Sequence, residues 1–390
     1  MQTRIRRVLS ALIASVVFGG SAAAGDVTIL APRAVMPDGS LADRVRIVID
    51  DDGRIKSVAT GQRDAAAAEA DTTVIRFEQG VLSPGLIDLG SSLGVTNDDR
   101  SNAASIDADP SMIDAFDPLS DDLREAARSG ITAALITPAP NAVLGGRAAI
   151  VRTATLDPDQ RVIDRDGPFV LTIGPSAWDL EFGPSSRAGA LYELRQALDD
   201  ATGQGSFAGF DGKSEAMYLR AASFDDLQAA LRVLNARDVK PVVQHTHDLV
   251  EIPSEAYEAT AGLVAGPLTI SSSPRDLSGP SIAHANGAAI AFSSGRGQFR
   301  DSEALRRTAT LATRYGLDAA AARRGLTSEA ARMAGVGDTI GSLAEGMAAD
   351  LVLFSEDPLR PDARVLEVWV QGDRIFSHQY ERNPLDDQRD

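Results

Sequence analysis

Short apolar stretches alternate with amphipathic segments through the middle of the chain. Four segments have the 3.6-residue period of helices: residues 120–130, 191–200, 224–238 and 301–316. Eight apolar stretches are typical of buried strands: residues 85–90, 130–138, 148–153, 168–174, 216–221, 240–246, 262–268 and 288–294. This alternation predicts a parallel sheet covered by helices, and eight strands in about 250 residues fit a (β/α)8 TIM-like barrel. A doubly wound open sheet is the alternative, but no GxGxxG motif follows an early strand.

Both ends of the remaining chain have a strand-like pattern. Residues 26–77 contain four short strand candidates with a turn at Asp52 and Gly53, and residues 349–378 contain three with a turn at Gly372 and Asp373. Neither end alone has enough strands for a stable unit, so we expect them to pair into one small composite β-sandwich. The predicted domains are therefore this sandwich, residues 25–80 plus 340–390, and a barrel, residues 81–339.

The first 24 residues have the pattern of an export signal. Three arginines precede an apolar run over residues 8–20, and small residues follow at 21–24. The run is shorter than the roughly 20 apolar residues that span a bilayer. We expect cleavage after Ala24 and a soluble exported protein, periplasmic in a Gram-negative source. An ordinary N-terminal helix is the alternative.

Composition excludes several classes of protein. The chain has 390 residues with 44% hydrophobic and 24% charged residues, which is typical of a soluble globular protein. Its formal net charge of -17 repels nucleic acid and anionic lipid surfaces, and we expect no basic patch beyond the first seven residues. The absence of cysteine means that nitrogen and oxygen atoms must hold any metal.

Several segments resemble the amidohydrolase superfamily, in particular its imidazolonepropionase-like members. The segment VLSPGLIDLGSSLG is similar to that family's first barrel strand, PGhIDxHxH, where h is hydrophobic. The resemblance continues in the same order through residues 129–153, 224–245 and 325–359, which include the closing segment GSLAEGMAADLVLF. It implies the barrel with its composite sandwich, and the hydrolysis of C–N bonds by a divalent metal such as zinc.

The resemblance also places metal ligands where this chain carries other residues. The H-x-H of the first strand falls on Gly90 and Ser92, a later histidine falls on Arg220, and the last-strand aspartate falls at about Gly295. Only the histidine at His245 is retained. Glycine and guanidinium groups do not coordinate metals, and a serine hydroxyl is a poor ligand. We therefore expect a degenerate metal site.

A few residues remain candidates for a site at the barrel mouth. His245 and His247 form a new H-x-H that could hold a metal, and Asp88 is a candidate catalytic or structural carboxylate. A buried Arg220 must meet either an internal carboxylate or an anionic ligand. Gly145 and Gly146 are expected to form a loop near a ligand.

Two classes of function stay open. The first is a non-catalytic protein without a cofactor, which binds a small molecule or acts as a subunit beside a paralogous amidohydrolase or in a homo-oligomer. The alternative is a metal-dependent hydrolase of amides, cyclic amides or dipeptides, with His245 and His247 as ligands or His245 as the base. A sugar binder ranks last because Trp178 and Trp369 are the only tryptophans.

Overall fold

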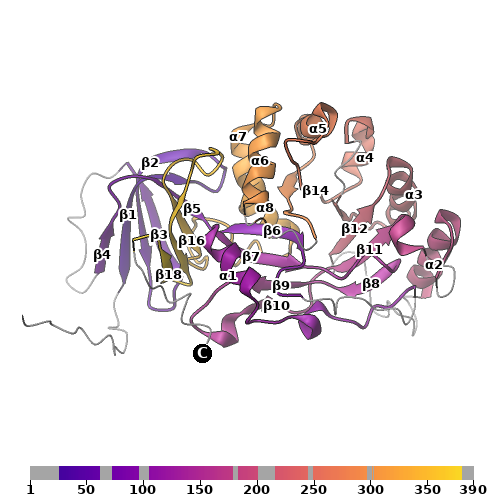
Figure 1. Cartoon of the computed structure of the whole chain (residues 1–390), viewed down its shortest axis with the longest axis horizontal. Coiled ribbons are helices and arrows are strands. Elements are labelled where there is room, and N and C mark those ends of the chain that lie inside the picture. The colour runs from indigo at the N-terminus through magenta and orange to yellow at the C-terminus, as the bar shows by residue number, and fades with distance from the viewer. Residues whose placement is uncertain are drawn as a thin grey trace, which may run out of the picture.

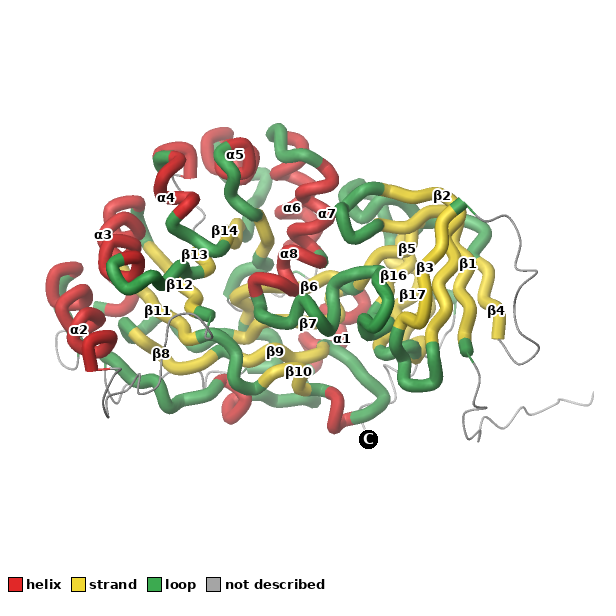
Figure 2. Tube along the Cα trace, turned by 180° about the vertical axis from the view of Figure 1, so that it is seen from behind, coloured by secondary structure: helices red, strands yellow, loops and turns green. Residues whose placement is uncertain are grey.

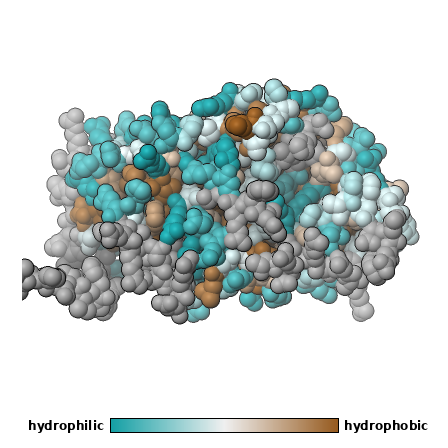
Figure 3. All heavy atoms as spheres, in the orientation of Figure 1, coloured by the Kyte–Doolittle hydropathy of each residue, from teal (hydrophilic) through white to brown (hydrophobic). Residues whose placement is uncertain are grey.

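The computed structural model describes residues 26–61, 73–95, 105–178, 183–200, 216–244, 249–296, 301 and 303–379. The predicted export signal lies outside these ranges. Figure 1 shows a sheet at one end of the molecule and a larger unit of strands and helices beside it. Among the described residues, no helix is long and apolar enough to cross a membrane. The face shown in Figure 3 is mostly hydrophilic, with apolar side chains gathered over the sheet at that end.

The two ends of the chain share one eight-stranded sheet. Its N-terminal strands are β1 (Val27–Val35), β2 (Leu41–Ile49), β3 (Ile55–Thr60), β4 (Thr73–Arg76) and β5 (Val81–Pro84), and its C-terminal strands are β16 (Leu351–Phe354), β17 (Val365–Val370) and β18 (Asp373–Ser377). The strand order is β18-β17-β16-β5-β1-β2-β3, and β4 pairs with β1. The antiparallel pair β16–β5 joins the two ends, so that Leu353 lies opposite Leu82.

This composite sheet has its own core, which includes Ile29, Ile47, Leu82, Leu351 and Trp369. Because β5 pairs with both β1 and β16, the sheet extends to Pro84, four residues past the expected boundary. The strands form one hydrogen-bonded sheet, and the predicted sandwich of two facing sheets is not confirmed.

The eight predicted apolar stretches all form strands of the larger unit. One sheet has the order β15-β14-β13-β12-β11-β8 and the other β10-β9-β7-β6. The first contains β8 (Leu144–Arg147), β11 (Phe169–Ile173), β12 (Met217–Ala221), β13 (Val242–Gln244), β14 (Gly262–Ala265) and β15 (Ile290–Phe292). The second contains β6 (Leu86–Ser91), β7 (Ile131–Ile136), β9 (Ala149–Arg152) and β10 (Val162–Asp164).

The expectation that all eight stretches run parallel is wrong for one of them. Strand β9, in the predicted stretch 148–153, pairs antiparallel with β7, and the adjoining β8 pairs antiparallel with β11. Only seven residues separate β7 from β8, whereas a parallel crossover needs a dozen or more. The extended segment 144–152 therefore runs back between β7 and β11 and pairs with each along part of its length.

Strands β6 and β15 face each other where a barrel would close. They lie in contact but share no ladder of backbone hydrogen bonds, so no closed barrel is detected among the described strands. A side chain crosses this seam instead. The backbone N–H of Ser294, just after β15, donates to Oδ1 of Asp88 on β6 at 2.8 Å.

Helices cover the outer face of these strands, as Figure 2 shows from behind. They are α1 (Asp121–Arg128), α2 (Arg187–Asp200), α3 (Phe224–Asn235), α4 (Ser254–Glu258), α5 (Pro274–Ala285), α6 (Ala304–Arg314), α7 (Ala319–Leu326) and α8 (Ser328–Met333). The four predicted helical segments correspond to α1, α2, α3 and α6. Short 3-10 helices occupy Met112–Ala115, Pro158–Gln160, Pro175–Ala177 and Leu249–Glu251.

Alternating strand residues separate two cores. Leu171, Leu219 and Val243 pack with the helices in the larger core, whereas Tyr218 and Val242 belong to a second core on the opposite face of the strands. This period-2 alternation directs every second residue of each strand towards the centre of the unit. The residues at the carboxyl ends of the parallel strands consequently form the mouth.

Candidate active site at the barrel mouth

A cavity of about 270 Å³ lies at the mouth, beside the carboxyl ends of β6 and β15. Such positions are where barrels of this kind carry their functional residues. Its described lining consists of Asp88, Ser91, Ser92, Leu93, Asp122, Glu125, Ala126, Ile131, Pro267, Ser294, Gly295, Arg296 and Asp301.

Asp88 is fully buried at the seam between β6 and β15. Its carboxylate accepts hydrogen bonds from both the backbone N–H and the hydroxyl of Ser294. Burial raises the pKa of Asp88 to about 6, although the hydrogen bonds from Ser294 act in the opposite direction. Asp88 therefore has a structural role in joining the two strands, and its carboxyl group also faces the cavity.

Two arginines converge on Thr137, the residue after β7. Arg220 of β12, only 9% exposed, donates to the hydroxyl of Thr137, to the carbonyl of Pro138 at 2.8 Å and to Oε1 of Gln244 at 3.0 Å. Arg296 donates to the carbonyl of Thr137, and to its hydroxyl at 2.8 Å. These contacts of Arg220 use hydroxyl, carbonyl and amide oxygen atoms, which fix its guanidinium group between β7, β12 and β13.

Gly90 leaves no room for a side chain. A Cβ atom at this position would lie 2.5 Å from the hydroxyl oxygen of Tyr218 and 3.1 Å from both terminal atoms of the Gln244 amide. Its φ of +81° is also in the left-handed region that glycine adopts readily. The space in which the sequence resemblance places a histidine is thus taken by Tyr218 and Gln244.

Gly295 is crowded in a similar way. Its φ is +87°, and a Cβ atom there would lie 2.8 Å from Cδ of Pro267. An aspartate at this position would meet the proline ring. Ser92 lines the cavity and is half-buried, so it is the one of these three positions where the native side chain faces open space.

The predicted histidine pair, His245 and His247, lies outside the described residues. Within the described part of the chain, no group of three or more histidine or acidic side chains is placed to hold a metal ion. His284 lies at the end of α5, where its Nδ1 is 3.3 Å from the carbonyl oxygen of Ala288.

Gly145 and Gly146 differ from expectation, because they lie in strand β8 and do not form a loop. A Cβ atom on Gly146 would lie 2.2 Å from the carbonyl oxygen of Pro110, and one on Gly145 would lie 3.3 Å from the ring of Pro138. These glycines therefore lie close to backbone and proline atoms of the protein itself, and not to a ligand-binding space. Neither is among the described residues that line the cavity.

Four residues of the mouth were missed by sequence reasoning: Thr137, Tyr218, Gln244 and Arg296. Tyr218 precedes Arg220 by two positions on β12, so the alternation of a strand does predict that both side chains share a face. Nothing local indicates that Thr137 meets Arg296, because 159 residues separate them along the chain.

Comparison with known proteins finds a family match for part of the chain. Residues 212–375 match the model of the amidohydrolase family. This segment of the chain resembles that family. An amidohydrolase from Thermotoga maritima MSB8 has a TM-score of 0.78 with 19% sequence identity over 90% of this chain and 100% of that chain. No curated protein matches the sequence.

Two further structures have lower TM-scores over similar lengths. A putative prolidase from Bifidobacterium longum has a TM-score of 0.59 with 17% identity, over 94% of this chain and 98% of that one. An A. niger ochratoxinase has a TM-score of 0.61 with 16% identity, over 93% of this chain and 98% of that one. At such identities the likeness establishes a TIM-barrel-like α/β fold and leaves the chemistry to the site.

The described residues of this mouth do not fit a divalent metal centre. The positions that would carry ligands hold Gly90, whose side-chain space is filled, and Arg220, whose fixed positive charge repels a cation. Gly295 is blocked by Pro267. No catalytic step through a metal follows from this arrangement.

Proposed function

We propose that this amidohydrolase-like protein is non-catalytic and that its mouth binds a small zwitterionic molecule, such as an amino acid or a dipeptide. One observation carries the proposal. Tyr218 and Gln244 fill the space beside Gly90, and the guanidinium group of Arg220 takes the place of a metal ligand. Without a metal there is no Lewis acid and no ready source of hydroxide near neutral pH.

The charges around the cavity support a ligand with both signs of charge. The carboxyl groups of Asp88, Asp122, Glu125 and Asp301 line the cavity, and Arg296 is its only basic described residue. A ligand ammonium group would be stabilised by the acidic residues, and a ligand carboxylate by the planar guanidinium of Arg296. A cavity of about 270 Å³ suits a molecule of this size.

A calorimetric titration tests this binding. We expect methionine or alanylproline to bind saturably in the presence of a chelator and to be recovered unhydrolysed. Arg296→Gln should weaken binding by about tenfold or more, because it removes charge-assisted hydrogen bonds. Arg165→Gln, at an exposed position, is the control and should leave the affinity unchanged. Failure of every zwitterion to bind would contradict the proposal.

A metal-dependent hydrolase of C–N bonds in amides, cyclic amides or dipeptides is the second candidate. The match to the amidohydrolase family favours it, because the matched residues 212–375 include both His245 and His247. The similarity to a structure named as a putative prolidase favours dipeptides as its substrates. In that case the same titration would yield cleaved dipeptide when zinc replaces the chelator.

The proposal extends to location and partners. The pattern of residues 1–24 supports export to the periplasm, and a barrel without a working metal centre suits a subunit that accompanies an active paralogue or forms a homo-oligomer. Copurification with a second amidohydrolase chain would support the subunit role.

A further inference from the structure

Arginines from two distant segments meet in a pocket on the outer side of α6. Arg306, Arg307 and Arg314 of this helix face Arg360 and Arg364 from the loop before β17 across about 560 Å³. They are five of the twelve residues that line the pocket, whereas basic residues make up 38 of 390 in the whole chain. The expectation of no basic patch beyond the first seven residues is therefore wrong, because folding brings together arginines that are dispersed in the sequence.

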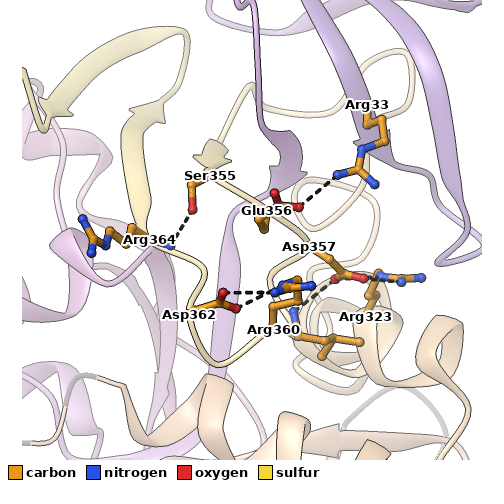
Figure 4. A network of polar contacts seen from close by, with 9 residues as sticks. Arg33, Arg323, Ser355, Glu356, Asp357, Arg360, Asp362 and Arg364 are labelled. Carbon is orange, nitrogen blue, oxygen red and sulfur yellow. Dashed lines mark hydrogen bonds and ion pairs between the residues drawn. The ribbon is translucent and has the colours of Figure 1, made fainter.

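Contacts within the fold hold the two walls of the pocket. The hydroxyl of Thr310 on α6 donates to the carbonyl of Leu359 in the loop at 3.0 Å. Asp357 anchors the same loop, because it accepts hydrogen bonds from the guanidinium group of Arg323 and from the backbone N–H of Leu359 (Figure 4). The hydroxyl of Ser355 accepts a hydrogen bond from the backbone N–H of Arg364 at 3.0 Å. The arginines are consequently presented on a preformed surface.

Internal ion pairs compensate three of the five arginines. Arg306 pairs with Glu303, Arg307 with Asp301, and Arg360 with Asp362 through two hydrogen bonds of 3.0 Å. Arg306 is only 5% exposed and also donates to the carbonyl of Pro358 at 3.3 Å. It forms a fixed part of the wall.

The other two arginines have no described carboxylate partner, so their charges are available to a ligand. Arg314 and Arg364 are exposed, and neither forms an ion pair with any residue that the structure describes. Counting Asp301, the pocket carries five positive and three negative side chains. A ligand with two negative charges would balance this excess. Ile270, 87% exposed, offers an apolar contact at the edge of the pocket.

We propose that this arginine pocket is a second binding site, for a small molecule that carries two or more negative charges as phosphate or carboxylate groups. The forked guanidinium group matches the geometry of both. The site shares no lining residue with the mouth cavity, whose described lining has four carboxyl groups and one arginine, although Asp301 of that cavity pairs with Arg307 of the pocket. It does not depend on the function proposed for the mouth.

The test is calorimetry on the full chain at low ionic strength, with inorganic phosphate and citrate as separate probes. We expect one of them to bind with a stoichiometry near one, and added sodium chloride to weaken the binding. The double variant Arg314→Gln/Arg364→Gln should lower the affinity by about tenfold or more. Both side chains are exposed and form no ion pair with a described residue, so the fold should be retained, which circular dichroism checks.

A matched control separates a site from general charge attraction. Arg76→Gln/Arg165→Gln makes the same change in net charge at two exposed positions outside the pocket, and should leave the affinity unchanged. Preference for phosphate or for citrate would identify the class of the natural ligand. Three results would overturn the proposal: no saturable binding of either probe, binding that survives loss of Arg314 and Arg364, or equal weakening in both double variants.

Discussion

At the scale of single residues, the contact between Gly90 and Tyr218 decides what the mouth is able to hold. Gly90→Ala would place a Cβ atom 2.5 Å from the Tyr218 hydroxyl at a φ of +81°. Gly335 has a similar φ of +83°, and a Cβ atom added there would have no atom within 4 Å. Gly335→Ala should therefore lower the free energy of unfolding only by the cost of the left-handed backbone, about 1–2 kcal/mol. We expect Gly90→Ala to lower the free energy of unfolding, measured in urea, by about 1–3 kcal/mol more than Gly335→Ala does.

A second substitution assigns this additional loss to the hydroxyl. The Tyr218 hydroxyl has no hydrogen-bond partner in the described part of the chain, so Tyr218→Phe alone should cost little. Combined with Gly90→Ala, it should recover the part of the loss that comes from crowding. Equal losses for the alanine variants of Gly90 and Gly335 would show that the space beside Gly90 is open.

The buried carboxyl group of Asp88 gives a pH dependence with a definite sign. Its native pKa of about 6 lies above the ordinary value of 3.8, so between these values the native state binds the proton more tightly than the unfolded state. Stability from this group is greatest below pH 3.8 and is lost as pH rises through 6. From pH 4 to pH 7 the free energy of unfolding should fall by about 2 kcal/mol more than in Asp88→Asn. Parallel pH profiles for the two proteins would refute this.

At the scale of elements, a buried ion pair joins the barrel-like unit to the composite sheet. Nε of Arg152 on β9 lies 3.4 Å from Oδ2 of Asp350, which precedes β16. Asp350 also accepts the backbone N–H of Gln371 at 2.8 Å. Burial raises the pKa of Asp350, and Arg152 opposes this shift. This is the aspartate of the closing ADLV segment, so its place in the motif is explained by the junction that it forms.

Breaking this pair should be costly. Asp350→Asn leaves the Arg152 charge buried, and we expect a loss of about 3–5 kcal/mol in urea unfolding. Adding Arg152→Met should recover part of that loss. The exposed pair Arg360–Asp362 is the control, where Asp362→Asn should change the stability little because solvent screens the pair. If the double variant were less stable than Asp350→Asn, the proposed role of the pair would be wrong.

The direction of a strand is the part of an element that its own pattern does not predict. Residues 148–153 have the apolar pattern of the other barrel strands, yet β9 runs antiparallel to β7. The apolar pattern of a strand shows only that the strand is buried, and a strand is equally buried whether it runs parallel or antiparallel to its neighbour. The seven-residue connection between β7 and β8 was the available signal, because it is too short for a crossover helix.

At the scale of the whole molecule, the sequence was most informative about the fold. The alternating pattern predicted strands at both ends of the chain. Because neither end has enough strands for a stable unit, it also predicted that the two ends pair, which β5 and β16 confirm. Residue identity also showed that Gly90 and Arg220 cannot act as metal ligands. The residues that fill the mouth were not predictable, because Thr137, Tyr218 and Arg296 become neighbours only when the strands are assembled.

The central claim is that the mouth holds a network of polar side chains in place of a metal centre, and elemental analysis tests it most directly. Zinc, manganese, nickel and iron are counted per chain after mild purification, in the native protein and in His245→Ala. We expect transition metal far below one ion per chain in both proteins. Near-stoichiometric metal in the native protein that is lost in His245→Ala would contradict the claim and favour the metal-dependent hydrolase.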